Sequence, residues 1–201
     1  MDDKDKDLRN YVSKAKGISR KGLNITCFIG VFIFGWLLAV AFEYLGKKRL
    51  GWLYVIPIIV FLVNSRDGFI PAKVLAAVTY VIGWVHANAV LSGYRATARR
   101  WIAQIDGLPA EQRTIDRLLE KGILQSKVLS EFDSAAMTFS DALRLPGGDP
   151  MLLNFAGARL CNRKRFVEAK QFFDRALPLA TEGKLIEWIK RNQAAVEKKL
   201  R

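Results

Sequence analysis

The sequence contains very few of the residues that build metal sites, disulfide frameworks and most hydrolytic active sites. Its 201 residues include one histidine, His86, and two cysteines, Cys27 and Cys161. Cys27 lies in an apolar run and Cys161 in a charged region, so they imply no disulfide framework. One histidine and two separated cysteines also cannot assemble an ordinary zinc site. We therefore expect no bound metal and no cofactor.

The motifs of common enzymatic chemistry are absent as well. The sequence has no HExxH, no GxxxxGKS/T, no GxSxG and no GxGxxG. Each of these patterns places a nucleophile, a metal ligand or phosphate-binding backbone at a fixed spacing. The carboxylates lie on charged helical faces, where nothing makes them converge. The sequence therefore predicts a protein that is not an enzyme, with no catalytic residues.

Acidic residues are scarce relative to basic ones, and the net charge is +13. A basic excess can indicate nucleic acid, an anionic membrane surface or an acidic partner. The basic residues here alternate with acidic ones at helical spacing, and no basic stripe is rich in aromatic residues. This pattern does not favour nucleic acid as a partner. Positive charge that flanks membrane segments explains much of the excess.

Apolar and charged residues occupy different parts of the chain. Nearly all long apolar runs lie within residues 22–94, whereas residues 95–201 hold 20 of the 32 Lys and Arg. We expect an all-α chain in which transmembrane helices precede a soluble helical domain. Its expected parts are a polar N-terminal segment (1–22), a membrane domain (23–94), a basic amphipathic linker helix (95–106) and a helical domain (107–201).

Two apolar segments are predicted to cross the bilayer. Residues 23–45 form a run of 23 residues, which is about 34 Å as a helix. The second predicted span covers residues 72–94. In it Thr79, Gly83 and Ala87 recur every four residues and form a ridge of small residues that would let another helix pack closely. Residues 50–63 contain Pro57 and are too short for a full crossing, so this segment is re-entrant, interfacial or a short span.

The flanking charges favour two crossings with both termini in the cytoplasm. This arrangement places seven basic residues inside and five outside, whereas three crossings divide them equally. We expect an integral membrane protein of the bacterial inner membrane, with an organelle membrane as the alternative. The roles of Glu43 and His86 stay open. In the linker helix, Arg95, Arg99, Arg100 and Trp101 are expected to anchor the chain at the membrane surface.

The soluble region contains the same pattern twice. Ala135, Phe139 and Ala142 are followed 34 residues later by Ala169, Phe173 and Ala176. A period of this length indicates one helix–turn–helix unit stacked on a copy of itself. The pattern resembles the tetratricopeptide repeat over about residues 115–181, and with Gly157 the second copy fits the family at all four of its characteristic positions. The first copy departs from the family at Ile123, where a small residue is expected, and both copies lack the family's proline at the end of the repeat.

The resemblance implies a protein-binding fold. In this family small residues let paired helices touch, and the aromatic residue fills the space between neighbouring pairs. The inner helices would line a groove for a protein partner, and the helix at 184–200 would cap the stack, unless repeats of another chain complete it. Carried over by position, the groove residues are Arg117, Glu120, Leu124, Lys127, Met151, Asn154, Ala158 and Asn162.

The sequence as a whole predicts a membrane-anchored scaffold that recruits protein partners at the cytoplasmic face, with the lipid bilayer as a second partner. Homo-oligomers are possible in this interpretation. Two alternatives remain open. The chain could be an accessory subunit of a channel, transporter or envelope assembly that uses the repeats for assembly. It could also be a lipid-associated protein that shapes membranes.

Overall fold

The computed structural model describes Lys6, Val12 and residues 70–201, and every regular element within residues 70–201 is a helix. The expectation of an all-α chain is confirmed for these residues. The chain divides into two compact units, residues 1–98 and 99–201. The first predicted span, at 23–45, and the short segment at 50–63 lie outside the described residues.

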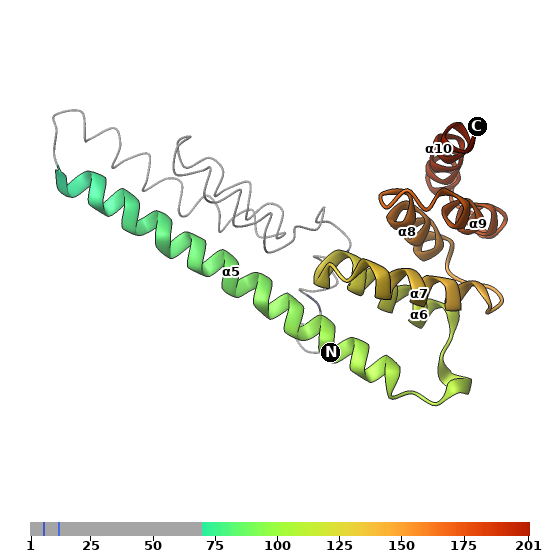
Figure 1. The fold of residues 1–201 in the computed structure, drawn as a ribbon, viewed down its shortest axis with the longest axis horizontal. Coiled ribbons are helices and arrows are strands. Elements are labelled where there is room, and N and C mark those ends of the chain that lie inside the picture. The colour runs from blue at the N-terminus through green and yellow to red at the C-terminus, as the bar shows by residue number, and fades with distance from the viewer. Residues whose placement is uncertain (1–5, 7–11, 13–69) are drawn as a thin grey trace. The chain divides into compact units, whose positions relative to one another are not determined.

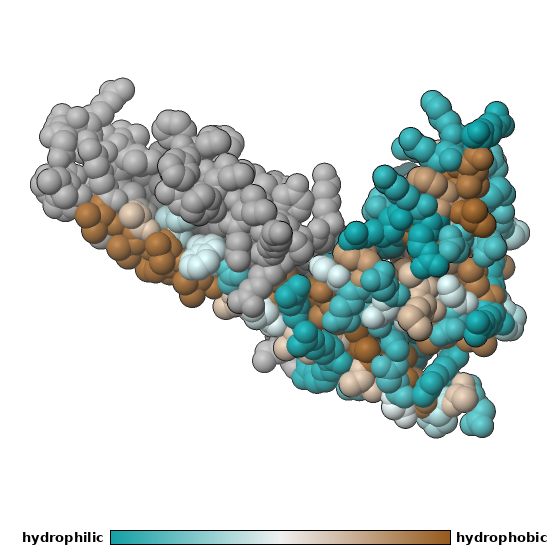
Figure 2. All heavy atoms as spheres, viewed as in Figure 1, coloured by the Kyte–Doolittle hydropathy of each residue, from teal (hydrophilic) through white to brown (hydrophobic). Residues whose placement is uncertain are grey.

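Helix α5 is a single helix of 37 residues, Ile70–Asp106 (Figure 1). It covers both the predicted second span and the predicted linker helix, and it ends directly before Gly107. Its half-exposed apolar side chains recur at helical spacing and form a brown strip in Figure 2. We call this strip the α5 apolar stripe. It consists of Val74, Val78, Val81, Ile82 and Val85.

No helix in the described part of the chain has a stretch long and apolar enough to cross a membrane. The predicted segment at 72–94 is therefore confirmed as helix, whereas the membrane span predicted there is not found. Polar residues interrupt its apolar run, among them His86 and Asn88, and they lower its mean hydropathy. The side-chain amide of Asn88 donates a hydrogen bond to the carbonyl oxygen of Trp84, 3.0 Å away.

Residues 107–201 fold into two helical hairpins and a final helix (Figure 1). The first hairpin contains α6 (Ile115–Leu124), a π-helical segment (Gln125–Leu129) and α7 (Phe132–Leu143). The second contains α8 (Pro150–Cys161) and α9 (Phe166–Ala176), followed by a 3₁₀ turn at Leu177–Leu179. Helix α10 (Gly183–Leu200) packs against α9 and α8.

Local sequence signals define the starts of the inner helices. The side chain of Thr114 caps α6, and the carboxylate of Asp149 accepts hydrogen bonds from the N–H groups of Met151 and Leu152 at 2.8 and 2.9 Å. These caps satisfy backbone donors that a helix start leaves without partners. An Asp cap followed by Pro as the first helical residue is a common start of a helix. Gly147 and Gly148 form the preceding turn with φ of 78° and 114°.

In each hairpin, the inner and outer helices meet at a close contact between a glycine and a phenylalanine. A Cβ atom added to Gly122 would lie 2.3 Å from the ring of Phe139, and one added to Gly157 would lie 2.6 Å from the ring of Phe173. Both rings are buried. This corrects two sequence expectations. The small residue of the first copy is Gly122 in place of Ile123, and Phe173 packs inside its own hairpin.

Other residues join the two hairpins. Phe172 meets Phe139 edge-on, with ring centroids 5.9 Å apart. Arg175 of α9 donates hydrogen bonds to the carbonyl oxygens of Leu143, the last residue of α7, and Leu145 just after it. The carboxylate of Asp116 accepts a hydrogen bond from the backbone N–H of Asp149, 2.7 Å away. The aromatic that fills the space between neighbouring hairpins is therefore Phe172.

Candidate binding cleft between the hairpins

The residues predicted to line a groove differ widely in exposure. The three that solvent reaches freely are Arg117, Met151 and Asn162, and the two that are half-buried are Glu120 and Ala158. Leu124, Lys127 and Asn154 are buried. The structure therefore brings only part of the predicted set to the surface.

Asn154 is covered by the final helix. Its side-chain oxygen accepts a hydrogen bond from the amide of Asn192 on α10, 2.9 Å away, and its exposed fraction is 0%. Its side-chain nitrogen has no hydrogen-bond partner within the described part of the chain. Beside this pair, Trp188 of α10 packs edge-on against Phe155 of α8, with ring centroids 5.3 Å apart. While α10 stays in place, Asn154 cannot meet a partner.

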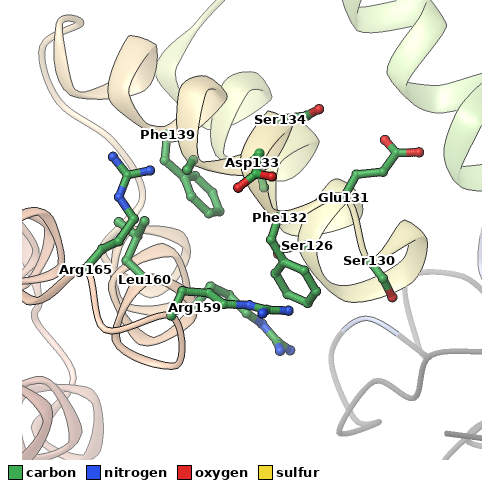
Figure 3. Close-up of a pocket in the computed structure, with 13 residues that line it drawn as sticks. Ser126, Ser130, Glu131, Phe132, Asp133, Ser134, Phe139, Arg159, Leu160 and Arg165 are labelled. Atoms are coloured by element: carbon green, nitrogen blue, oxygen red, sulfur yellow. The ribbon is translucent and has the colours of Figure 1, made fainter. Parts of the chain in front are cut away.

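A cleft of about 460 Å³ opens where the two hairpins meet near their inner turns. Figure 3 shows guanidinium groups on the side of α8 and α9, and carboxylates on the side of α7. Its walls combine charged, hydroxyl and aromatic side chains from both hairpins. They include Ser126, Ser130, Glu131, Phe132, Asp133, Ser134, Phe139, Arg159, Leu160, Arg163 and Arg165.

The turn within each hairpin places the charged residues at the cleft. Ser130 and Lys164 stand 34 residues apart and both adopt a left-handed backbone, with φ of 63° and 60°. In the second hairpin the N–H of Arg165 donates to the oxygen of Leu160, five residues earlier, in the manner of a Schellman motif. In the first hairpin, the N–H of Glu131 donates to the carbonyl oxygen of Gln125, six residues earlier.

The longer loop in the first hairpin reflects one extra residue. Gly122 and Gly157 are 35 residues apart, whereas Phe139 and Phe173 are 34 apart. The π-helical segment at Gln125–Leu129 accommodates the extra residue, since a π-helix is a local insertion into an α-helix and frequently marks a functional site. Gln125 is buried there and accepts a hydrogen bond from the hydroxyl of Thr138, 2.8 Å away.

Lys127 lies in this π-helical segment and is 7% exposed. Burial, and to a smaller extent the nearby guanidinium of Arg159, lower the pKa of its ammonium group to about 8. Both effects disfavour the charged form. Lys127 therefore lies buried near Arg159, which lines the cleft.

Charges at the mouth of the cleft are held in different ways. The guanidinium of Arg163 stacks on Phe132, 3.3 Å from the ring centroid. Arg165 instead donates to the carboxylate of Glu168 at 2.7 and 3.0 Å. Backbone hydrogen bonding and then Arg165 hold the pKa of Glu168 below its usual value, against the opposing effect of burial. The basic run at 163–165 is the main feature of the sequence that points to this cleft.

The residues predicted to contact the membrane lie on α5. Of the small-residue ridge, Thr79 is half-buried, while Gly83 and Ala87 are buried. Among the predicted surface anchors, Arg99 and Arg100 are exposed, and Arg95 and Trp101 are half-buried.

Within the part of the chain that the structure describes, no three potential ligands gather into a metal site. No protein-family profile, curated protein or solved structure matches the chain. The resemblance to tetratricopeptide repeats therefore rests on the residue pattern and stays a prediction.

Proposed function

We propose that this chain is a membrane-anchored scaffold whose helical domain, residues 107–201, binds protein partners at the cytoplasmic face of a membrane. The observation that carries the proposal is the repeated hairpin. Each copy has one close Gly–Phe contact and one left-handed turn residue at the end of the inner helix. Stacked hairpins of this kind bury a continuous core and leave extended faces that can bind other proteins.

Helix α10 supports the same proposal. Ile189 and Val196 on its inner side are buried, while its outer side carries exposed charged residues such as Lys184, Glu187 and Arg191. A stack of repeats needs a helix with a polar outer face to remain soluble at its end. The binding surface would then be the faces of the inner helices that α10 leaves uncovered.

Anchoring to a membrane is supported by the predicted span at 23–45 and by the α5 apolar stripe. A contiguous apolar strip suits lipid or another apolar helix better than water. Contact with another protein's helix would favour the alternative of a subunit in a membrane assembly. Anchoring would raise the effective concentration of any partner that the helical domain captures.

Affinity purification in mild detergent tests the proposal, with the full chain compared with a chain that lacks residues 107–201. We expect a specific partner that is lost with the helical domain. An assembly that survives the truncation would instead favour the membrane-subunit alternative.

Surface variants of the full chain locate the binding face. Arg117→Glu combined with Met151→Ser changes exposed positions on the inner helices and should weaken capture. Met137→Ser on the outer helix α7 is the control, because Met137 is 72% exposed. Equal loss of capture in the control would mean that the inner helices do not form the binding face.

A further inference from the structure

The cleft between the hairpins has two walls of opposite charge (Figure 3). Arg159, Arg163 and Arg165 come from the end of α8 and the start of α9, and we call them the arginine wall. Glu131 and Asp133 come from the start of α7, and we call them the carboxylate wall. Ser130 and Ser134 add hydroxyl groups on the same side as the carboxylates.

Some charged groups of each wall form no ion pair within the described residues. Within the described residues, Arg163 has no acidic partner, and its guanidinium contacts the face of Phe132. Stacking of this kind leaves the N–H groups at the edge of the guanidinium able to donate hydrogen bonds. The carboxylates of Glu131 and Asp133 likewise form no ion pair within the described part of the chain, in contrast to Asp106, Glu168 and Asp174.

A simple ion fits this cleft poorly. An anion bound to the arginine wall would be repelled by the carboxylates, and a cation bound to the carboxylate wall would be repelled by the arginines. A ligand with both charges satisfies the two walls at once. The volume of about 460 Å³ admits a few side chains of a polypeptide, since ligand pockets range from about 300 to 1,000 Å³.

We propose that the cleft binds a segment of a partner protein that carries an acidic and a basic side chain close together. The acidic side chain pairs with the arginine wall, above all with Arg163, and the basic side chain pairs with Glu131 and Asp133. The inference rests on the proposed scaffold function and names the chemistry of the partner. It places this contact in the cleft beside the inner turns, apart from the exposed positions Arg117 and Met151.

A synthetic array of short capped peptides, with variable positions that hold Glu, Lys or Ser, tests this with the full chain in detergent at low salt. Peptides that contain both Glu and Lys should be retained about tenfold more than all-Glu, all-Lys or all-Ser peptides, which corresponds to two exposed ion pairs. Arg163→Glu should shift the preference to all-Lys peptides, and Glu131→Lys should shift it to all-Glu peptides. Neither variant removes an ion pair of the described structure.

Two controls change the net charge equally outside the cleft. Arg144→Glu matches Arg163→Glu, because the Arg144 side chain is 80% exposed. Glu111→Lys matches Glu131→Lys on the exposed turn before α6. Both controls should keep the preference for mixed peptides. The inference is overturned if mixed peptides have no advantage, or if the controls shift the preference as the cleft variants do. Partner capture that is insensitive to Arg163→Glu and Glu131→Lys would overturn it while leaving the scaffold function standing.

Discussion

At the scale of single residues, the spacing inside each hairpin depends on a side chain that is missing. Gly122 and Gly157 have no Cβ, so the rings of Phe139 and Phe173 can lie directly against the inner helices. Any larger residue at these positions would force the paired helices apart, because buried aromatic rings in a close-packed core cannot shift far. These two Gly–Phe contacts therefore explain why glycine and phenylalanine recur in both hairpins.

Phe173→Ala should sharply lower the melting temperature of the helical domain. Phe173 is 0% exposed, and replacing a buried Phe by Ala typically costs about 3–5 kcal/mol. This loss is a large part of the free energy of unfolding of a typical domain, which is roughly 5–15 kcal/mol. Thermal unfolding of the full chain in detergent measures the change. Val167→Ala in the same helix is the control, because Val167 is 60% exposed. Similar small shifts in both variants would contradict the assigned packing.

Lys127 makes the stability of the domain depend on pH in a defined direction. Its pKa is lowered from 10.5 to about 8 in the folded chain, so between these values the unfolded chain binds more protons. The free energy of unfolding should therefore rise with pH across this window. At pH 7 the ammonium is largely charged in both states, so its burial and the repulsion by Arg159 destabilise the folded domain.

Lys127→Met should remove this pH dependence and raise the melting temperature at pH 7. Melting curves of the full chain from pH 7 to above pH 10, with Lys184→Met on the exposed face of α10 as the control, provide the measurement. If the wild type and Lys127→Met keep a constant difference at every pH, Lys127 is not the group responsible.

At the scale of helices, local signals determined most of what could be predicted. Asp149 and Pro150 start α8, Gly147 and Gly148 form the turn before it, and Gly107 follows the end of α5. Each of these residues acts on its immediate neighbours, so its effect is readable from the sequence. The matched positions Phe139 and Phe173 also identified the two outer helices correctly.

The extra residue in the first hairpin could not be predicted, because a π-helical segment leaves no mark in the pattern of apolar residues. At a strict period of 34 residues, the position that corresponds to Gly157 is Ile123. In the structure it is Gly122 that makes the close contact with Phe139. The cleft could not be predicted from the sequence for a different reason. Arg163 and Phe132 lie 31 residues apart, and their contact depends on how two hairpins stack.

Deleting Ser126 should leave the helical domain folded. The deletion removes one residue from the π-helical segment, so the inner helix can continue as α-helix and reach Glu131 with the five-residue spacing of the second hairpin. Deleting Ala158 in α8 is the matched control. It should unfold the second hairpin, because every later residue of α8 would turn by about 100° and bury the wrong side chains. Circular dichroism and melting curves distinguish the two. Equal loss of helix in both would mean that the π-helical segment is not an insertion.

At the scale of the whole molecule, the last turn of α5 is tied to the helical domain. Arg113 donates hydrogen bonds to the carbonyl oxygens of Asp106 and Leu108 at 2.8 and 2.9 Å. Lys121 of α6 pairs with the carboxylate of Asp106. The bond to Asp106 satisfies a carbonyl oxygen that the end of α5 leaves without a partner. The last turn of α5 and the start of the first hairpin therefore form one connected structure.

The basic residues of α5 should hold this connected structure at an anionic membrane surface. Arg95, Arg99 and Arg100 can each contribute about 1 kcal/mol near such a surface, and salt screens the effect. A fluorescent side chain placed at position 101 should be quenched more deeply by lipid-borne quenchers in anionic than in neutral vesicles. Replacing the three arginines by Ser should remove the difference. Replacing Lys184, Lys190 and Arg191 on α10 by Ser removes the same charge elsewhere and should leave the difference intact. Quenching that is equal in both lipids and insensitive to salt would mean that these arginines do not orient the helical domain.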